Sequence, residues 1–130
     1  MNKQITIVVI ATRSIPLADG LDALLKAIPQ IEKVETVNTI EQAMQRVEEI
    51  KPRVLLLDLS LEGKKPETLL EKILSLSPET LRVLLVDDVQ GIKWQPQFAE
   101  AILVKGTSPS AFATILTDLL FLNGDKNEIN

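Results

Sequence analysis

Short apolar runs alternate with amphipathic stretches along almost the whole chain. Five runs rich in Val, Ile and Leu are typical of short strands, at 5–10, 34–37, 54–57, 83–86 and 101–104. Between them, apolar residues recur three and four positions apart, which is the spacing of one face of a helix. These helical patterns cover residues 21–28, 40–50, 66–74 and 112–120. The second strand run is the most polar, so we expect it at an edge of a sheet.

Residues that end or begin helices separate these segments. Proline closes three of the helical units, at Pro29, Pro52 and Pro78. Thr39 and Gln42 have the spacing of a capping box, in which the two side chains bond the free amides at a helix start. The stretch 89–100 contains Gly91 and Pro96, so at most a short, irregular helix fits there.

Alternating strands and helices predict an α/β fold with a parallel sheet that is covered on both faces. Five strands in 130 residues suggest a flavodoxin-like, doubly wound sheet in the order 2-1-3-4-5, with an irregular or shortened fourth helix. We expect a single domain over residues 1–122. A polar, frayed tail over residues 123–130 is expected to begin near Gly124.

Composition excludes several kinds of chemistry. The chain has no Cys and no His, which removes thiol catalysis, disulfides and histidine acid–base catalysis. Its formal net charge of −4 does not favour nucleic-acid binding by this domain. No apolar run is long enough for a membrane span, and no signal peptide is evident, so we expect a cytoplasmic protein without membrane contact.

Polar residues follow the predicted strands, at the edge where doubly wound sheets bind their ligands. The candidate site residues are Thr12, Arg13, Asp58, Asp87, Asp88 and Lys105. Asp58 comes directly after the most hydrophobic strand and is the central candidate. A structural alternative is that Asp58 is only a hydrogen-bonded strand end.

Three segments resemble bacterial response-regulator receiver domains of the CheY-like kind. They are the run 51–59, which ends in Asp58-Leu59, the run 82–86, and the run 101–109 with its lysine. The resemblance covers roughly residues 4–122 and implies a role in two-component signal transduction or phosphorelay. It implies that Asp58 is the phosphoacceptor and that Lys105 pairs with the phosphoryl group. It also implies a signalling partner such as a histidine kinase or an output domain.

The chain departs from the receiver pattern at three functional positions. Ala11-Thr12 stands where receivers carry the acidic pair that holds magnesium. Asp87 falls where a Ser or Thr normally bonds the new phosphate, and Ile102 falls where an aromatic residue normally switches rotamer. Together these changes indicate a pseudo-receiver, without the metal, the phosphate sensor or the relay.

We therefore interpret the chain as a protein–protein interaction module rather than an enzyme, with no cofactor and no metal. In the alternative interpretation, it is a phosphorylatable receiver that uses Asp58 and holds Mg²⁺ with Asp58, Asp87 or Asp88. In that case it could be the N-terminal part of a DNA-binding transcriptional regulator. A homodimer is compatible with either interpretation.

Some individual residues keep two interpretations. Asp58 and Lys105 are expected to form a partly buried salt bridge. Asp87 is either a turn residue or part of a relocated acidic pocket with Asp58, which would raise one carboxyl pKa. Trp94 either covers a sheet edge or is an exposed contact for a partner. Arg13 is either a solvated loop charge or reaches the anionic site near Asp58.

Overall fold

A computed structural model describes residues 6–61, 66–88 and 99–128 of the chain. Its strands are β1 (Ile7–Ala11), β2 (Lys33–Val37), β3 (Val54–Asp58), β4 (Leu81–Val86) and β5 (Ala101–Val104). They form one sheet in the order β2-β1-β3-β4-β5, and every neighbouring pair is parallel. The predicted doubly wound sheet is confirmed, and the polar strand β2 lies at an edge as expected.

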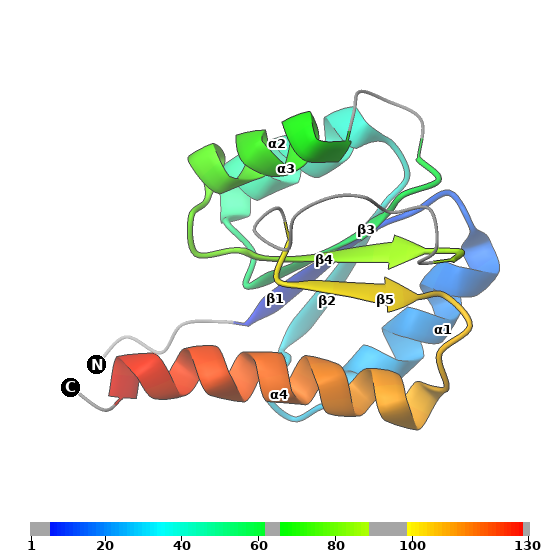
Figure 1. Ribbon diagram of the computed structural model, residues 1–130, viewed down its shortest axis with the longest axis vertical. Coiled ribbons are helices and arrows are strands. Elements are labelled where there is room, and N and C mark those ends of the chain that lie inside the picture. The colour runs from blue at the N-terminus through cyan, green and yellow to red at the C-terminus, as the bar shows by residue number, and fades with distance from the viewer. Residues whose placement is uncertain (1–5, 62–65, 89–98, 129–130) are drawn as a thin grey trace.

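Four helices cover the two faces of this sheet within the described residues. They are α1 (Ile15–Lys26), α2 (Ile40–Ile50), α3 (Pro66–Leu76) and α4 (Pro109–Glu128). Figure 1 shows α2 and α3 together on one face, with α1 and α4 on the other. The stretch in which we expected an irregular helix falls mostly at 89–98, outside the described residues.

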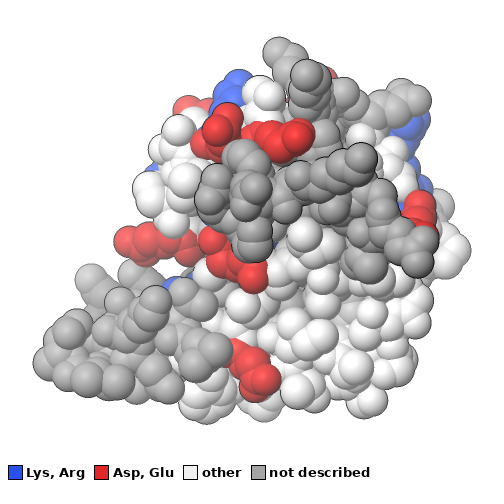
Figure 2. Space-filling view, viewed as in Figure 1, with Lys and Arg blue, Asp and Glu red and all other residues white. Residues whose placement is uncertain are grey.

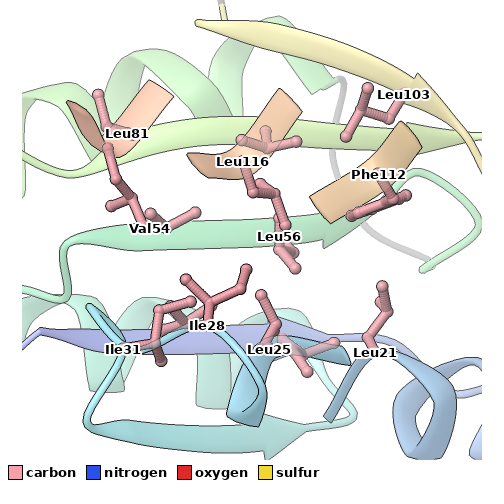
Figure 3. Packing of buried hydrophobic residues seen from close by; sticks show 14 of the residues in the cluster. Leu21, Leu25, Ile28, Ile31, Val54, Leu56, Leu81, Leu103, Phe112 and Leu116 are labelled. Carbon is pink, nitrogen blue, oxygen red and sulfur yellow. The ribbon is translucent and has the colours of Figure 1, made fainter. Parts of the chain in front are cut away.

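Alternating side chains along the central strands separate the core into two layers. In β1, Val8 and Ile10 pack on the α1 and α4 side, while Val9 and Ala11 pack on the α2 and α3 side. Figure 3 shows the first layer, in which Leu25 of α1 and other helix side chains meet those of the sheet. Because β1 and β3 are buried on both faces, their sequences are apolar at nearly every position.

The last helix continues further than the sequence indicates. We expected an end near Gly124, but α4 runs through that residue to Glu128. A glycine inside a helix costs only about 1 kcal/mol relative to alanine, which is too little to end a helix by itself.

Helix α2 begins with the predicted cap, although the reciprocal bond differs. The Thr39 hydroxyl accepts from the Gln42 amide at 3.0 Å, as expected. The Gln42 side chain accepts from the amide of Asn38 at 3.1 Å. In a capping box this side chain usually accepts from the amide of the N-cap residue, here Thr39, so the bond in this chain reaches one residue further back.

Replacing Thr39 by alanine is expected to lower the free energy of unfolding by about 1 kcal/mol, because the Gln42 amide loses its acceptor. Thermal unfolding followed by circular dichroism should show a melting temperature lower by about 4 °C. Thr39→Ser keeps the hydroxyl and should melt close to the wild type. Equal melting of the alanine and serine variants would show that the cap does not stabilise the domain.

Candidate functional site

The register of the sheet brings the predicted site residues to one edge. Ala11 pairs with Leu57, Asp58 with Leu85, and Val86 with Val104, so these strands end close to one level. The residues that follow them are Thr12, Asp87 and Lys105. All the strands point the same way in Figure 1, and their carboxyl ends meet at this edge.

Asp58 is buried at the centre of this edge and is bonded through both carboxylate oxygens. The Thr12 hydroxyl donates to its Oδ2 at 2.6 Å. The Ser60 amide and the Lys105 ammonium reach its Oδ1 at 2.8 and 2.6 Å. Asp58 is 3% exposed and Thr12 is 2% exposed, so this carboxylate is neutralised and solvated by protein groups.

Lys105 joins the ends of three neighbouring strands. Besides Asp58, its ammonium donates to the Ser60 hydroxyl at 2.8 Å and lies 3.3 Å from Asp87 Oδ1. The Asp87 side chain is 80% exposed, so its ion pair with Lys105 is weak compared with the buried pair. The expected Asp58–Lys105 salt bridge is therefore present. Asp87 joins the site through its ion pair with Lys105.

The charge balance of the site is set by opposing effects on Asp58. Burial alone would raise the pKa of this carboxyl, but hydrogen bonds from Lys105, Thr12 and Ser60 and the Lys105 charge lower it below its ordinary value. A raised carboxyl pKa in a relocated acidic pocket is therefore not seen at Asp58. For Lys105, burial opposes the charged form, but Asp58 and Asp87 raise the pKa of the ammonium overall.

This lowered pKa makes a specific prediction for stability at acidic pH. A carboxyl that ionises more readily in the folded state stabilises the fold fully above its unfolded pKa, ordinarily 3.8. The contribution is lost as pH falls through the lower folded pKa. Melting temperatures from about pH 7 to about pH 2 should therefore show the wild type losing its advantage over Asp58→Asn below the ordinary value.

Glu35 also contributes to the pH dependence of stability, because its hydrogen bond with Arg46 lowers the pKa of its carboxyl. Glu35 is unchanged in Asp58→Asn, so its contribution cancels when the two proteins are compared at each pH. A difference between them that stays constant down to the most acidic pH would contradict the assignment to Asp58.

The other predicted residues have different outcomes. Arg13 and Asp88 are exposed residues that follow β1 and β4 at the same edge. Trp94 lies outside the described residues, so both of its interpretations stay predictions. Ile102 is half-buried and packs against the core layer on the α2 and α3 side.

Sequence reasoning missed Ser60 as a site residue. Its amide bonds Asp58 two positions earlier, which is the geometry of an Asx turn. An Asp followed two positions later by a Ser could have suggested the turn, but the contact between the Ser60 hydroxyl and Lys105 depends on the arrangement of β3 and β5.

Protein donors face both oxygens of Asp58, the carboxylate that a magnesium ion at this edge would use. Mg²⁺ is usually held by one or two carboxylates with water molecules, in near-octahedral geometry. Here Thr12 and Lys105 donate to the two oxygens of Asp58. Within residues 6–61, 66–88 and 99–128, no three acidic, His or Cys side chains lie together as metal ligands.

Comparisons with known proteins found similarity in fold but no match by sequence. No protein-family profile matches it, and no curated protein matches it by sequence. No helix within the described residues is long and apolar enough to cross a membrane.

Solved structures, in contrast, match over most of the chain. A CheY-like receiver domain from Methanospirillum hungatei has a TM-score of 0.78 and 16% identity, covering 95% of this chain and 99% of that one. A signal receiver domain from Vibrio parahaemolyticus has a TM-score of 0.83 and 22% identity, covering 98% of both chains. The Salmonella typhimurium response regulator RcsB has a TM-score of 0.73 and 20% identity, covering 91% of this chain and 61% of that one. The chain has the fold of CheY-like response-regulator receiver domains.

Proposed function

We propose that this chain is a receiver-like signalling module that acts mainly through protein–protein contact, with Mg²⁺-dependent phosphorylation of Asp58 impaired or absent. The observation that carries the proposal is that both carboxylate oxygens of Asp58 are already bonded by protein groups. Thr12, Ser60 and Lys105 donate to its two oxygens in a buried setting. These contacts lower the nucleophilicity of both oxygens and restrict the approach of a phosphodonor.

Charge at the site supports the same proposal. A phosphoryl group on Asp58 would add negative charge close to Asp87, whose carboxylate already shares Lys105. Thr12 is neutral and offers no charge to hold a cation that would offset this repulsion. Both features make the phosphorylated state less favourable than in a site with an acidic pair and a neutral phosphate sensor.

The surface over α4 supports a role in protein contact. Between Pro109 and Phe121 the only charged residue is Asp118, and Figure 2 shows a largely uncharged surface toward its lower right, where the first half of α4 lies. The Phe121 side chain is exposed on the same helix. Nucleic acid would need basic residues there, whereas a protein partner would not. We propose a kinase, an output domain or a second copy as the partner class, in the cytoplasm.

The decisive experiment asks whether Asp58 accepts a phosphoryl group. The protein is incubated with Mg²⁺ and acetyl phosphate, and its intact mass is measured, with Asp58→Asn as the matched control. We expect no phosphoryl adduct on either protein. An adduct at substantial occupancy on the wild type alone would overturn the proposal and establish Asp58 as a working phosphoacceptor.

A second candidate function is favoured by one comparison. The chain spans only 61% of the RcsB chain, a response regulator whose structure is described in terms of DNA interaction. We propose as the alternative that this domain is the receiver part of a longer regulator whose DNA-binding segment lies elsewhere. Reading the gene downstream of this segment tests it, because a continuous reading frame into a helix-turn-helix domain is required.

A further inference from the structure

A series of hydrogen bonds, joined through the backbone and side chain of Ser14, leads from Asp58 to the start of α1. The Thr12 hydroxyl donates to Asp58 at 2.6 Å and accepts from the Ser14 amide at 3.1 Å. The Ser14 hydroxyl in turn accepts from the Leu17 amide at 3.2 Å, which makes Ser14 the N-cap of α1. Three consecutive bonds therefore connect the buried carboxylate with the first helical turn.

We propose that Thr12 is a positioning residue that couples the hydrogen bonding of the residue-58 side chain to the first turn of α1. The Thr12 hydroxyl has a single proton, and the carboxylate fixes where that proton points. One of the two lone pairs on the hydroxyl oxygen is thereby directed at the Ser14 amide, which sets the position of the Ser14 cap. A change at Asp58 that turns the Thr12 hydroxyl weakens both later bonds.

The two oxygens of Asp58 face different donors, so a change at Asp58 has a defined effect on Thr12. Asp58 Oδ1 accepts from Ser60 and Lys105, while Oδ2 accepts only from Thr12 within the described residues. If Asp58 became an amide, its carbonyl oxygen would take the side with the two donors. The amide nitrogen would then face Thr12 and donate to its hydroxyl, so Thr12 would change from donor to acceptor.

Burial makes the change costly to absorb elsewhere. Thr12 is 2% exposed, so water does not readily replace a lost partner, and its backbone amide is tied to Val37 of β2 at 3.0 Å. The residue can therefore respond by rotating its side chain more easily than by shifting its backbone. The coupling requires no phosphorylation, so it goes beyond the proposed function and stands or falls separately from it.

The test measures amide hydrogen exchange by NMR on the full chain, without metal or phosphodonor. In Asp58→Asn, exchange at the amides of Ser14 and Leu17 should be about fivefold faster than in the wild type, the effect of weakening one neutral hydrogen bond. Thr12→Val, which removes the hydroxyl, should accelerate the same amides. The double variant should exchange no faster than Thr12→Val alone, because the path is already broken.

Two controls separate this coupling from general loosening. The Gln42 amide at the cap of α2 makes the same kind of bond to the Thr39 hydroxyl, which within the described residues bonds neither Thr12 nor Asp58, so its exchange should not change. Thr12→Ser keeps the hydroxyl and should preserve the response to Asp58→Asn. Equal acceleration at Gln42, unchanged exchange at Ser14 and Leu17, or an undiminished response in the Thr12→Val background would each overturn the proposal.

Discussion

Replacing Lys105 by methionine is expected to lower the free energy of unfolding by about 3 kcal/mol at neutral pH. Methionine keeps most of the aliphatic chain but removes the ammonium that lies 2.6 Å from Asp58. Asp58 would keep its bonds from Thr12 and Ser60 but would remain a buried charge without a close cation. Without Lys105, the pKa of Asp58 would be higher than in the wild type, and denaturant titrations at neutral pH should show the loss of stability.

The matched control is the double variant Asp58→Asn with Lys105→Met. It removes both charges, so it should be more stable than Lys105→Met alone even though it carries one more substitution. The deficit of the single variant should also shrink at acidic pH, where Asp58 is protonated. If Lys105→Met were as stable as the wild type at neutral pH, the ion pair would not be what holds Asp58 in its charged form.

The sheet could be predicted from the sequence because its central strands are buried on both faces. Burial on both faces removes the need for polar alternation, and β3 is accordingly Val-Leu-Leu-Leu before Asp58. Helix ends were less predictable, as α4 shows. Helix α4 continues through Gly124 because a single glycine destabilises a helix by only about 1 kcal/mol relative to alanine.

Part of the polar structure could not be read from strand patterns. Arg82 lies within an apolar strand and is 4% exposed, a burial that its charge does not predict. Its guanidinium bonds Glu100 at 3.1 Å and the Leu70 carbonyl at 3.1 Å, and its amide bonds Glu100 at 2.6 Å. These partners come from α3 and from the residue before β5, so only the assembled fold shows how the charge is compensated.

For the candidate site, the sequence predicts which residues meet but not how they bond. Strand ends predicted that Thr12, Asp58, Asp87 and Lys105 would meet, because parallel strands share one carboxyl edge. The direction of each bond could not be predicted. Thr12 was singled out in the sequence because it stands where receivers carry an acidic residue. In the structure its hydroxyl donates a hydrogen bond to the Asp58 carboxylate.

Replacing Thr12 by aspartate is expected to make the stability of the domain depend on divalent cations. The new carboxylate would lie beside Asp58, where the Thr12 hydroxyl now approaches to 2.6 Å, and the two like charges would repel. Without added metal, the variant should unfold at lower denaturant than the wild type. Mg²⁺ at about one hundred times its Kd should then add about 2.7 kcal/mol of stability, because it binds only the folded pair.

Thr12→Asn is the control for this variant, since asparagine has the same shape as aspartate without its charge. Neither Thr12→Asn nor the wild type should respond to Mg²⁺, because neither places a second carboxylate beside Asp58. A wild type stabilised by Mg²⁺ as strongly as Thr12→Asp would show that the Thr12 side chain does not determine cation binding. A response confined to Thr12→Asp would show that one hydroxyl in place of a carboxylate is enough to keep this edge of the sheet free of metal.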